Sequence, residues 1–166
     1  MKKSQASSRH RARELATQLL YSLSARPDQD ITECLGVFTS EGGYASEESP
    51  EVKEYLSFLI KGVWGRRFEI DDVMRRVVTG WRPERMVAVD RAVLRMAIFE
   101  GFLEKSAPLA VAISEAVELV CAFGTEDSGK FVNGVLGKLA RAIDGWDNGQ
   151  HGNDNAVAPS ETSADC

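Results

Sequence analysis

Apolar residues recur every three or four positions along almost the whole chain, and this spacing constrains the fold more than any other feature. Over residues 8–25 it places Leu15, Leu19 and Leu23 on one face of a helix. The same spacing recurs over residues 30–40, 50–67, 69–79, 85–105, 108–123 and 125–143. The sequence carries no hairpin signal, internal repeat or sustained heptad. We therefore predict an all-α protein with about seven helices.

Glycine and proline residues mark where these helices should end. Pro27 follows the first helix, and Gly80 and Pro83 separate the fourth from the fifth. The fifth, residues 85–105, is apolar on most sides, which predicts a buried central helix. Residues 41–50 are rich in Gly, Ser and Glu, and we expect a mobile loop without packing contacts there.

The chain of 166 residues is long enough for one domain with a sizeable core. We expect a single helical domain over residues 1–145 and an acidic, disordered tail over residues 146–166, where Gly, Asn, Asp and Ser predominate. No apolar run approaches the roughly 20 residues that a membrane-spanning helix needs. The N-terminus is basic and lacks the apolar stretch of a secretion signal. These features predict a cytoplasmic protein.

Charge is distributed unevenly along the chain. The net charge is −5, yet residues 1–13 carry five basic and no acidic side chains. Arg9, Arg13, Thr17 and Tyr21 follow at steps of four, so we expect them in a row on one helix face, turned away from the buried leucines. Guanidinium groups hold phosphates, and a tyrosine ring can stack on a base for roughly 1–3 kcal/mol. The row favours a helix that holds single-stranded RNA, although Tyr21 is equally explained as a rim residue of the core.

The segment ending in Lys130 matches the G-x-x-x-x-G-K skeleton of a nucleotide-binding loop, but its neighbours argue against that role. Phe131 stands where the magnesium-binding hydroxyl should be. Glu126 and Asp127 would repel phosphates. A corner between two helices is the better interpretation, because acidic residues favour the positive end of a helix dipole. Lys130 and Phe131 could touch a ligand at this corner, although Phe131 is better explained as a core residue than as a ligand contact.

Three charged residues interrupt the apolar fifth helix. Asp90, Arg91 and Arg95 would cost free energy there unless they are paired or reach a surface. They either line one solvated edge of the helix or mark a groove that meets a protein partner.

Nothing in the sequence indicates catalysis or metal binding. Glu115 and Glu118 fit the solvated face of the sixth helix. His10 and His151 lie near the two ends of the chain, and no cysteine pair has the spacing of metal ligands. We therefore expect no enzyme activity, no cofactor and no metal.

Three segments together resemble the bacterial transcription antitermination factors of the NusB family. Residues 9–22 resemble the opening helix of that family, residues 90–100 its central helix, and residues 108–136 its C-terminal signature. The likeness extends over about residues 8–143. It implies an all-helical fold in which two small helical subdomains pack together.

The resemblance also implies a function. Members of this family bind boxA RNA in nascent ribosomal RNA transcripts, pair with the ribosomal protein NusE, and join NusA, NusG and RNA polymerase to prevent premature termination. No cofactor and no reaction are implied. Two alternatives remain open: a helical protein-interaction module or homodimer without an RNA role, and a relative of the N-terminal domains of ribosomal RNA methyltransferases, which would need a nucleotide-binding catalytic half.

Site residues follow from the resemblance at matching positions. The RNA surface would comprise Arg9, Arg11, Arg13 and Tyr21, with Lys130 and Phe131 nearby. Asp90 would face NusE, and Asp127 would lie close to the bound ligands, where its charge could moderate RNA affinity.

Overall fold

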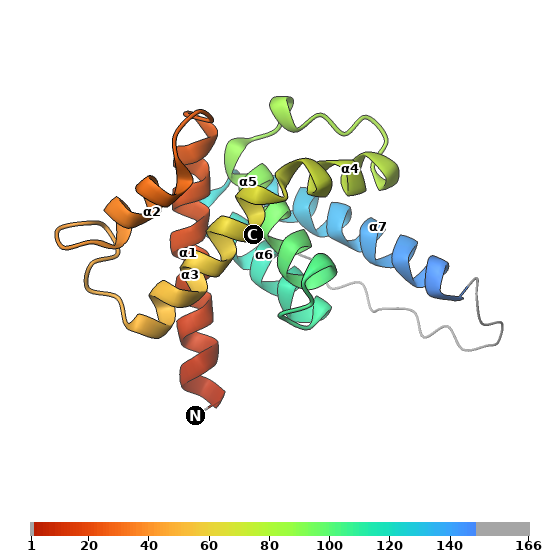
Figure 1. Ribbon diagram of the computed structural model, residues 1–166. Coiled ribbons are helices and arrows are strands. Elements are labelled where there is room, and N and C mark those ends of the chain that lie inside the picture. Colours follow the sequence, from red (N-terminus) through yellow and green to blue (C-terminus); the bar gives the residue numbers. More distant parts are fainter. Residues whose placement is uncertain (1, 149–166) are drawn as a thin grey trace.

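The computed structural model describes the backbone of residues 2–148 and the side chains of residues 5–144. The helices are α1 (Lys2–Ser24), α2 (Ile31–Thr39), α3 (Pro50–Gly65), α4 (Arg67–Val77), α5 (Ala88–Ile98), α6 (Leu109–Phe123) and α7 (Ser128–Asn148). A 3₁₀ turn, η1 (Pro83–Arg85), and a π-helical turn, η2 (Phe99–Leu103), complete the elements (Figure 1). No strand occurs in this part of the chain, which confirms the predicted all-α class.

The helices form two groups that share one core. Helices α1, α2 and α3 pack against one another on one side of the molecule, and α4 to α7 form the other side (Figure 1). Contacts of α1 with α5 and α6 join the groups. The largest fully buried side chains come from both groups and include Leu15, Leu56, Leu94 and Leu119. None of the described helices is long and apolar enough to cross a membrane.

Local signals in the sequence explain where several helices begin. The Asp30 carboxylate accepts a hydrogen bond from the Glu33 N–H at 2.8 Å and caps α2. Ser49 caps α3, with proline at the first helical position. The seventh helix continues to Asn148, past the predicted domain end at residue 145. The rest of the predicted tail lies outside the described residues.

The predicted fifth helix is interrupted, and this interruption shapes the centre of the molecule. Regular α-helix ends at Ile98 and widens into the π turn η2. Helix α3 approaches this turn so closely that a Cβ at Gly62 would lie 2.0 Å from the ring of Phe99. The π turn places Glu100 in the interior with 1 % exposure.

The expectation of an unpacked loop at residues 41–50 is wrong. Ala45 is fully buried, and its N–H donates to the carbonyl of Phe38 at 2.8 Å. The rings of Phe38 and Tyr44 lie 5.4 Å apart. Gly42 adopts φ +79°, a left-handed conformation that glycine tolerates best, and this allows the chain to turn back onto α2.

Candidate nucleic-acid interface

Helix α1 presents Arg9 at the surface beside α3. Its guanidinium lies 4.9 Å from the ring centroid of Tyr55, and its Nη1 donates to the carbonyl of Ser106 at 3.2 Å. These contacts fix a half-buried cation in place. Because a guanidinium has five N–H donors, Arg9 can keep the bond to Ser106 and still donate to a phosphate.

Arg13, predicted to stand in the same exposed row, is buried with 3 % exposure. Its Nε donates to Glu100 Oε2 at 2.9 Å and its Nη2 to Oε1 at 2.6 Å. Thr17 is also buried, and its hydroxyl donates to the carbonyl of Arg13. The expectation of an exposed row is therefore wrong at these two positions, because η2 places a carboxylate directly against this face of α1. A guanidinium so enclosed cannot reach a phosphate without breaking its ion pair.

The ion pair between Arg13 and Glu100 joins several elements. The hydroxyl of Tyr55 on α3 also donates to Glu100, and Glu115 of α6 lies 3.3 Å from Arg13 Nη1. Burial, the hydrogen bond to Glu100 and the negative charge of Glu100 raise the pKa of Tyr55 to about 12. Burial alone would lower the pKa of Arg13, but the bond to Glu100 and the charge of Glu100 outweigh burial and raise it. Arg13 therefore stays charged near neutral pH.

Arg11 is accessible, with 41 % of its side chain exposed. It contacts Glu14 at 2.9 Å and Glu48 at 2.7 Å. Hydrogen bonds to these two carboxylates raise the pKa of Arg11. An RNA phosphate would have to compete with the carboxylates for this guanidinium.

Tyr21 lies in the C-terminal half of α1 and is 53 % exposed. Lys130 and Phe131 stand on α7, just after the corner that follows α6, and Phe131 is 41 % exposed. The interpretation of Phe131 as a core residue is therefore wrong; its neighbour Val132 is the buried one. Asp127 is exposed at the same corner.

Asp90 does not lie at the surface. It is 4 % exposed, and its Oδ1 has no hydrogen-bond partner among the described residues. The nearby charges are also satisfied internally: Arg95 pairs with Asp71 at 2.6 Å, and Arg91 donates to the carbonyl of Pro83. The expectation that this group lines a solvated edge or a partner groove is wrong for Asp90, because α5 is covered by its neighbours.

The aromatic side of this surface was not among the residues predicted from the sequence. Tyr55 and Phe58, one turn apart on α3, stack with ring centroids 5.6 Å apart, and Phe58 is 36 % exposed. The signal was an aromatic pair at i and i+3, hidden within an apolar helix pattern. We call the Arg9 surface the group formed by Arg9, Tyr55, Phe58 and Ser106. It combines a fixed cation with exposed ring area, so it can hold a phosphate and contact a base.

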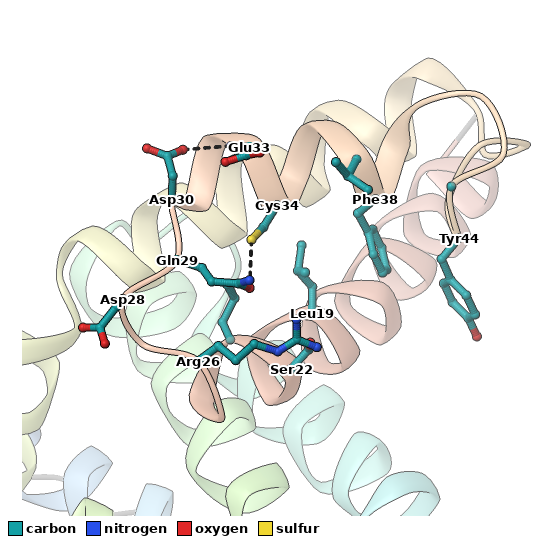
Figure 2. Close-up of a pocket in the computed structure, with 13 residues that line it drawn as sticks. Leu19, Ser22, Arg26, Asp28, Gln29, Asp30, Glu33, Cys34, Phe38 and Tyr44 are labelled. Carbon is teal, nitrogen blue, oxygen red and sulfur yellow. Dashed lines mark hydrogen bonds between the residues drawn. The ribbon is translucent and has the colours of Figure 1, made fainter.

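A cavity of about 600 Å³ opens elsewhere, between the end of α1 and α2. Figure 2 shows Asp28, Asp30 and Glu33 toward one end of it and Phe38 and Tyr44 toward the other. The three carboxylates would repel a phosphate chain. The Arg9 surface is therefore the better candidate for RNA.

Comparison with known proteins gives a consistent result. The model of the NusB family matches residues 10–141. A transcription antitermination protein NusB of Symbiobacterium thermophilum is 40 % identical over 141 residues, which cover 83 % of this chain and 92 % of the relative.

Solved structures agree. The structure of T. maritima NusB is 35 % identical with a TM-score of 0.70, and the match covers 80 % of this chain and 90 % of that one. A crystal structure of antitermination factors NusB and NusE in complex with dsRNA matches with 26 % identity and a TM-score of 0.71 over 81 % of this chain and 97 % of that one. The match therefore extends over almost the full length of these proteins, and the chain belongs to the NusB family.

Proposed function

We propose that this protein is an RNA-binding transcription antitermination factor that acts by holding RNA and performs no reaction. The Arg9 surface carries the proposal, because it places a fixed cation and two aromatic rings side by side. Membership of a family whose relatives are named transcription antitermination proteins supports the role. The same names favour it over a methyltransferase-like function.

The specific ligand is boxA RNA of nascent ribosomal RNA transcripts, bound in the cytoplasm together with ribosomal protein NusE. The complex then joins NusA, NusG and RNA polymerase and prevents premature termination. The sequence resemblance supports these assignments, and a solved complex of related antitermination factors NusB and NusE with dsRNA supports RNA and NusE as partners. When free of these partners, the protein is a monomer or a homodimer.

The accessible residues of the proposed RNA surface make different contacts. Arg9 and Arg11 contact phosphates, so affinity falls as salt rises. Tyr21 and Phe131 offer rings to the bases, and Lys130 adds a cation at the α7 corner. These contacts would let the strand follow α1 and reach the start of α7.

The acidic and buried residues have other tasks. Asp127 is exposed at the α7 corner and weakens RNA binding there by charge repulsion. Arg13 forms an ion pair with Glu100, and Glu100 accepts a hydrogen bond from Tyr55 of the Arg9 surface, so Arg13 helps to hold that surface in place. Partner contacts of Asp90 would require α5 to be uncovered, so we assign it no direct contact.

A titration of labelled single-stranded boxA RNA, followed by fluorescence anisotropy, tests the proposal. We expect saturable binding, tighter binding in the presence of NusE because the two ligands are linked, and weaker binding of a scrambled RNA of equal length. Equal affinity for both RNAs with and without NusE would contradict the proposal. It would favour a protein-interaction module instead.

A further inference from the structure

Helices α1 and α6 bring a histidine into a group of carboxylates. His10 Nδ1 lies 2.8 Å from Glu115 Oε2, while His10 Nε2 lies 3.7 Å from Glu14 Oε1 and 4.0 Å from Glu118 Oε1. Ligand atoms of His10, Glu115 and Glu118 all lie within 4.8 Å of one another. Residues more than a hundred positions apart in the chain thus converge on one imidazole.

The distances distinguish two kinds of contact. The contact with Glu115 is a hydrogen bond, which orients the imidazole ring. The distances from Nε2 to Glu14 and Glu118 exceed hydrogen-bond length. Two ligands of one zinc ion, each about 2.0–2.2 Å from it, lie roughly 3.5 Å apart. The partly exposed side chains of His10 and Glu118 can close the small remaining difference by rotation.

We propose that His10, through Nε2, and Glu118 bind one divalent transition-metal ion of the zinc type between α1 and α6, with Glu14 as a further carboxylate within reach and Glu115 orienting the imidazole through Nδ1. An imidazole combined with carboxylates suits zinc and its neighbours better than magnesium or calcium, which prefer oxygen ligands alone. The proposal is independent of the proposed RNA function.

The charges around the imidazole leave room for a cation. Three carboxylates surround His10, from Glu14 on α1 and from Glu115 and Glu118 on α6. Two cations partly offset them: Arg13 near Glu115 and Arg11 near Glu14. The net charge of these carboxylates and arginines is still negative, which favours a cation that connects α1 to α6.

Protons compete with a metal for this imidazole. The hydrogen bond to Glu115 raises the pKa of His10 most; burial opposes the rise, and the charges of Glu115, Glu118 and Glu14 add to it. A metal ion must displace the proton that the charged imidazole carries on Nε2, so we expect binding to weaken as pH falls.

The test is calorimetric titration of the full-length protein with Zn²⁺, together with absorption spectra of the Co²⁺ complex. We expect one ion per chain, a Co²⁺ spectrum without thiolate charge transfer, and a Tm that rises on adding Zn²⁺. His10→Gln and Glu118→Gln should each lose saturable binding and the rise in Tm. Glu54→Gln and His151→Gln serve as matched controls and should keep both.

Several results would overturn the proposal. Among them are no saturable Zn²⁺ binding to the wild-type protein, retention of one equivalent by His10→Gln, and a Co²⁺ spectrum dominated by thiolate bands, which would place the ion on cysteines. Circular dichroism of each variant shows whether it is folded. Glu118 is 66 % exposed, so its substitution tests the site even if His10→Gln disturbs folding.

Discussion

Replacing Arg13 by methionine should strongly destabilise the fold. Methionine keeps most of the buried volume but removes the cation, and the Glu100 carboxyl, at 1 % exposure, would lose its ion-pair partner and keep only the hydrogen bond from Tyr55. Removing one partner of a buried ion pair costs about 3–5 kcal/mol. The free energy of unfolding of a domain of this kind is only about 5–15 kcal/mol, so Arg13→Met would remove a large share of it. Arg9→Ala, at the surface, should cost less than about 1 kcal/mol.

Urea unfolding of four proteins measures this effect: wild type, Arg13→Met, Glu100→Gln and the double variant. Glu100→Gln removes the carboxyl that Arg13→Met leaves without its cation. The double variant should therefore be less destabilised than the sum of the two single variants, by about 0.5–3 kcal/mol. The slope of the free energy of unfolding against urea concentration should be the same for all four proteins. A cost below about 1 kcal/mol for Arg13→Met, or additive effects, would refute the structural role of the pair.

Three further predictions concern single aromatic or glycine positions. Tyr21→Ala should weaken boxA binding by about 1–3 kcal/mol per stacked base in an anisotropy titration without lowering Tm, and a lowered Tm would show that Tyr21 is structural. Ultraviolet titration should detect one phenol that ionises near pH 12 in the wild type and is missing from Tyr55→Phe. Because the pKa of Tyr55 in the folded protein exceeds the ordinary 10.0, the contribution of Tyr55 to folding stability is present below pH 10 and is lost as pH rises through about 12. Gly62→Ala should destabilise the fold by about 1–3 kcal/mol in urea, because its Cβ meets the Phe99 ring, and an unchanged midpoint would contradict this packing.

The helices could be predicted from the sequence because their signals are local. Apolar spacing and breakers such as Gly80 and Pro83 lie within a few residues of the boundaries that they set. The exposure of Tyr21 follows from the same spacing, since its position falls outside the leucine stripe of α1. The π turn has no such local signature, so a continuous helix over residues 85–105 was the natural expectation.

The errors at the site share one cause: they depend on partners far away in the sequence. Arg13 is buried because Glu100, 87 positions later, meets it on the π turn. Glu115 fits a solvated face within its own helix, yet it bonds to His10 from α1. A one-dimensional pattern shows which side chains share a helix face, but it does not show which face of another helix will cover them.

The salt dependence of boxA RNA affinity tests the central claim most directly. Affinities of the wild type and Arg9→Ala should be measured from low to moderate salt, with Arg76→Ala on α4 as a control at an exposed arginine away from the Arg9 surface. We predict that Arg9→Ala weakens binding and reduces the slope of log affinity against log salt by roughly 0.7–1, as expected for one lost phosphate contact, while Arg76→Ala matches the wild type. An Arg9→Ala variant with unchanged affinity and slope would contradict the claim that this surface holds the RNA.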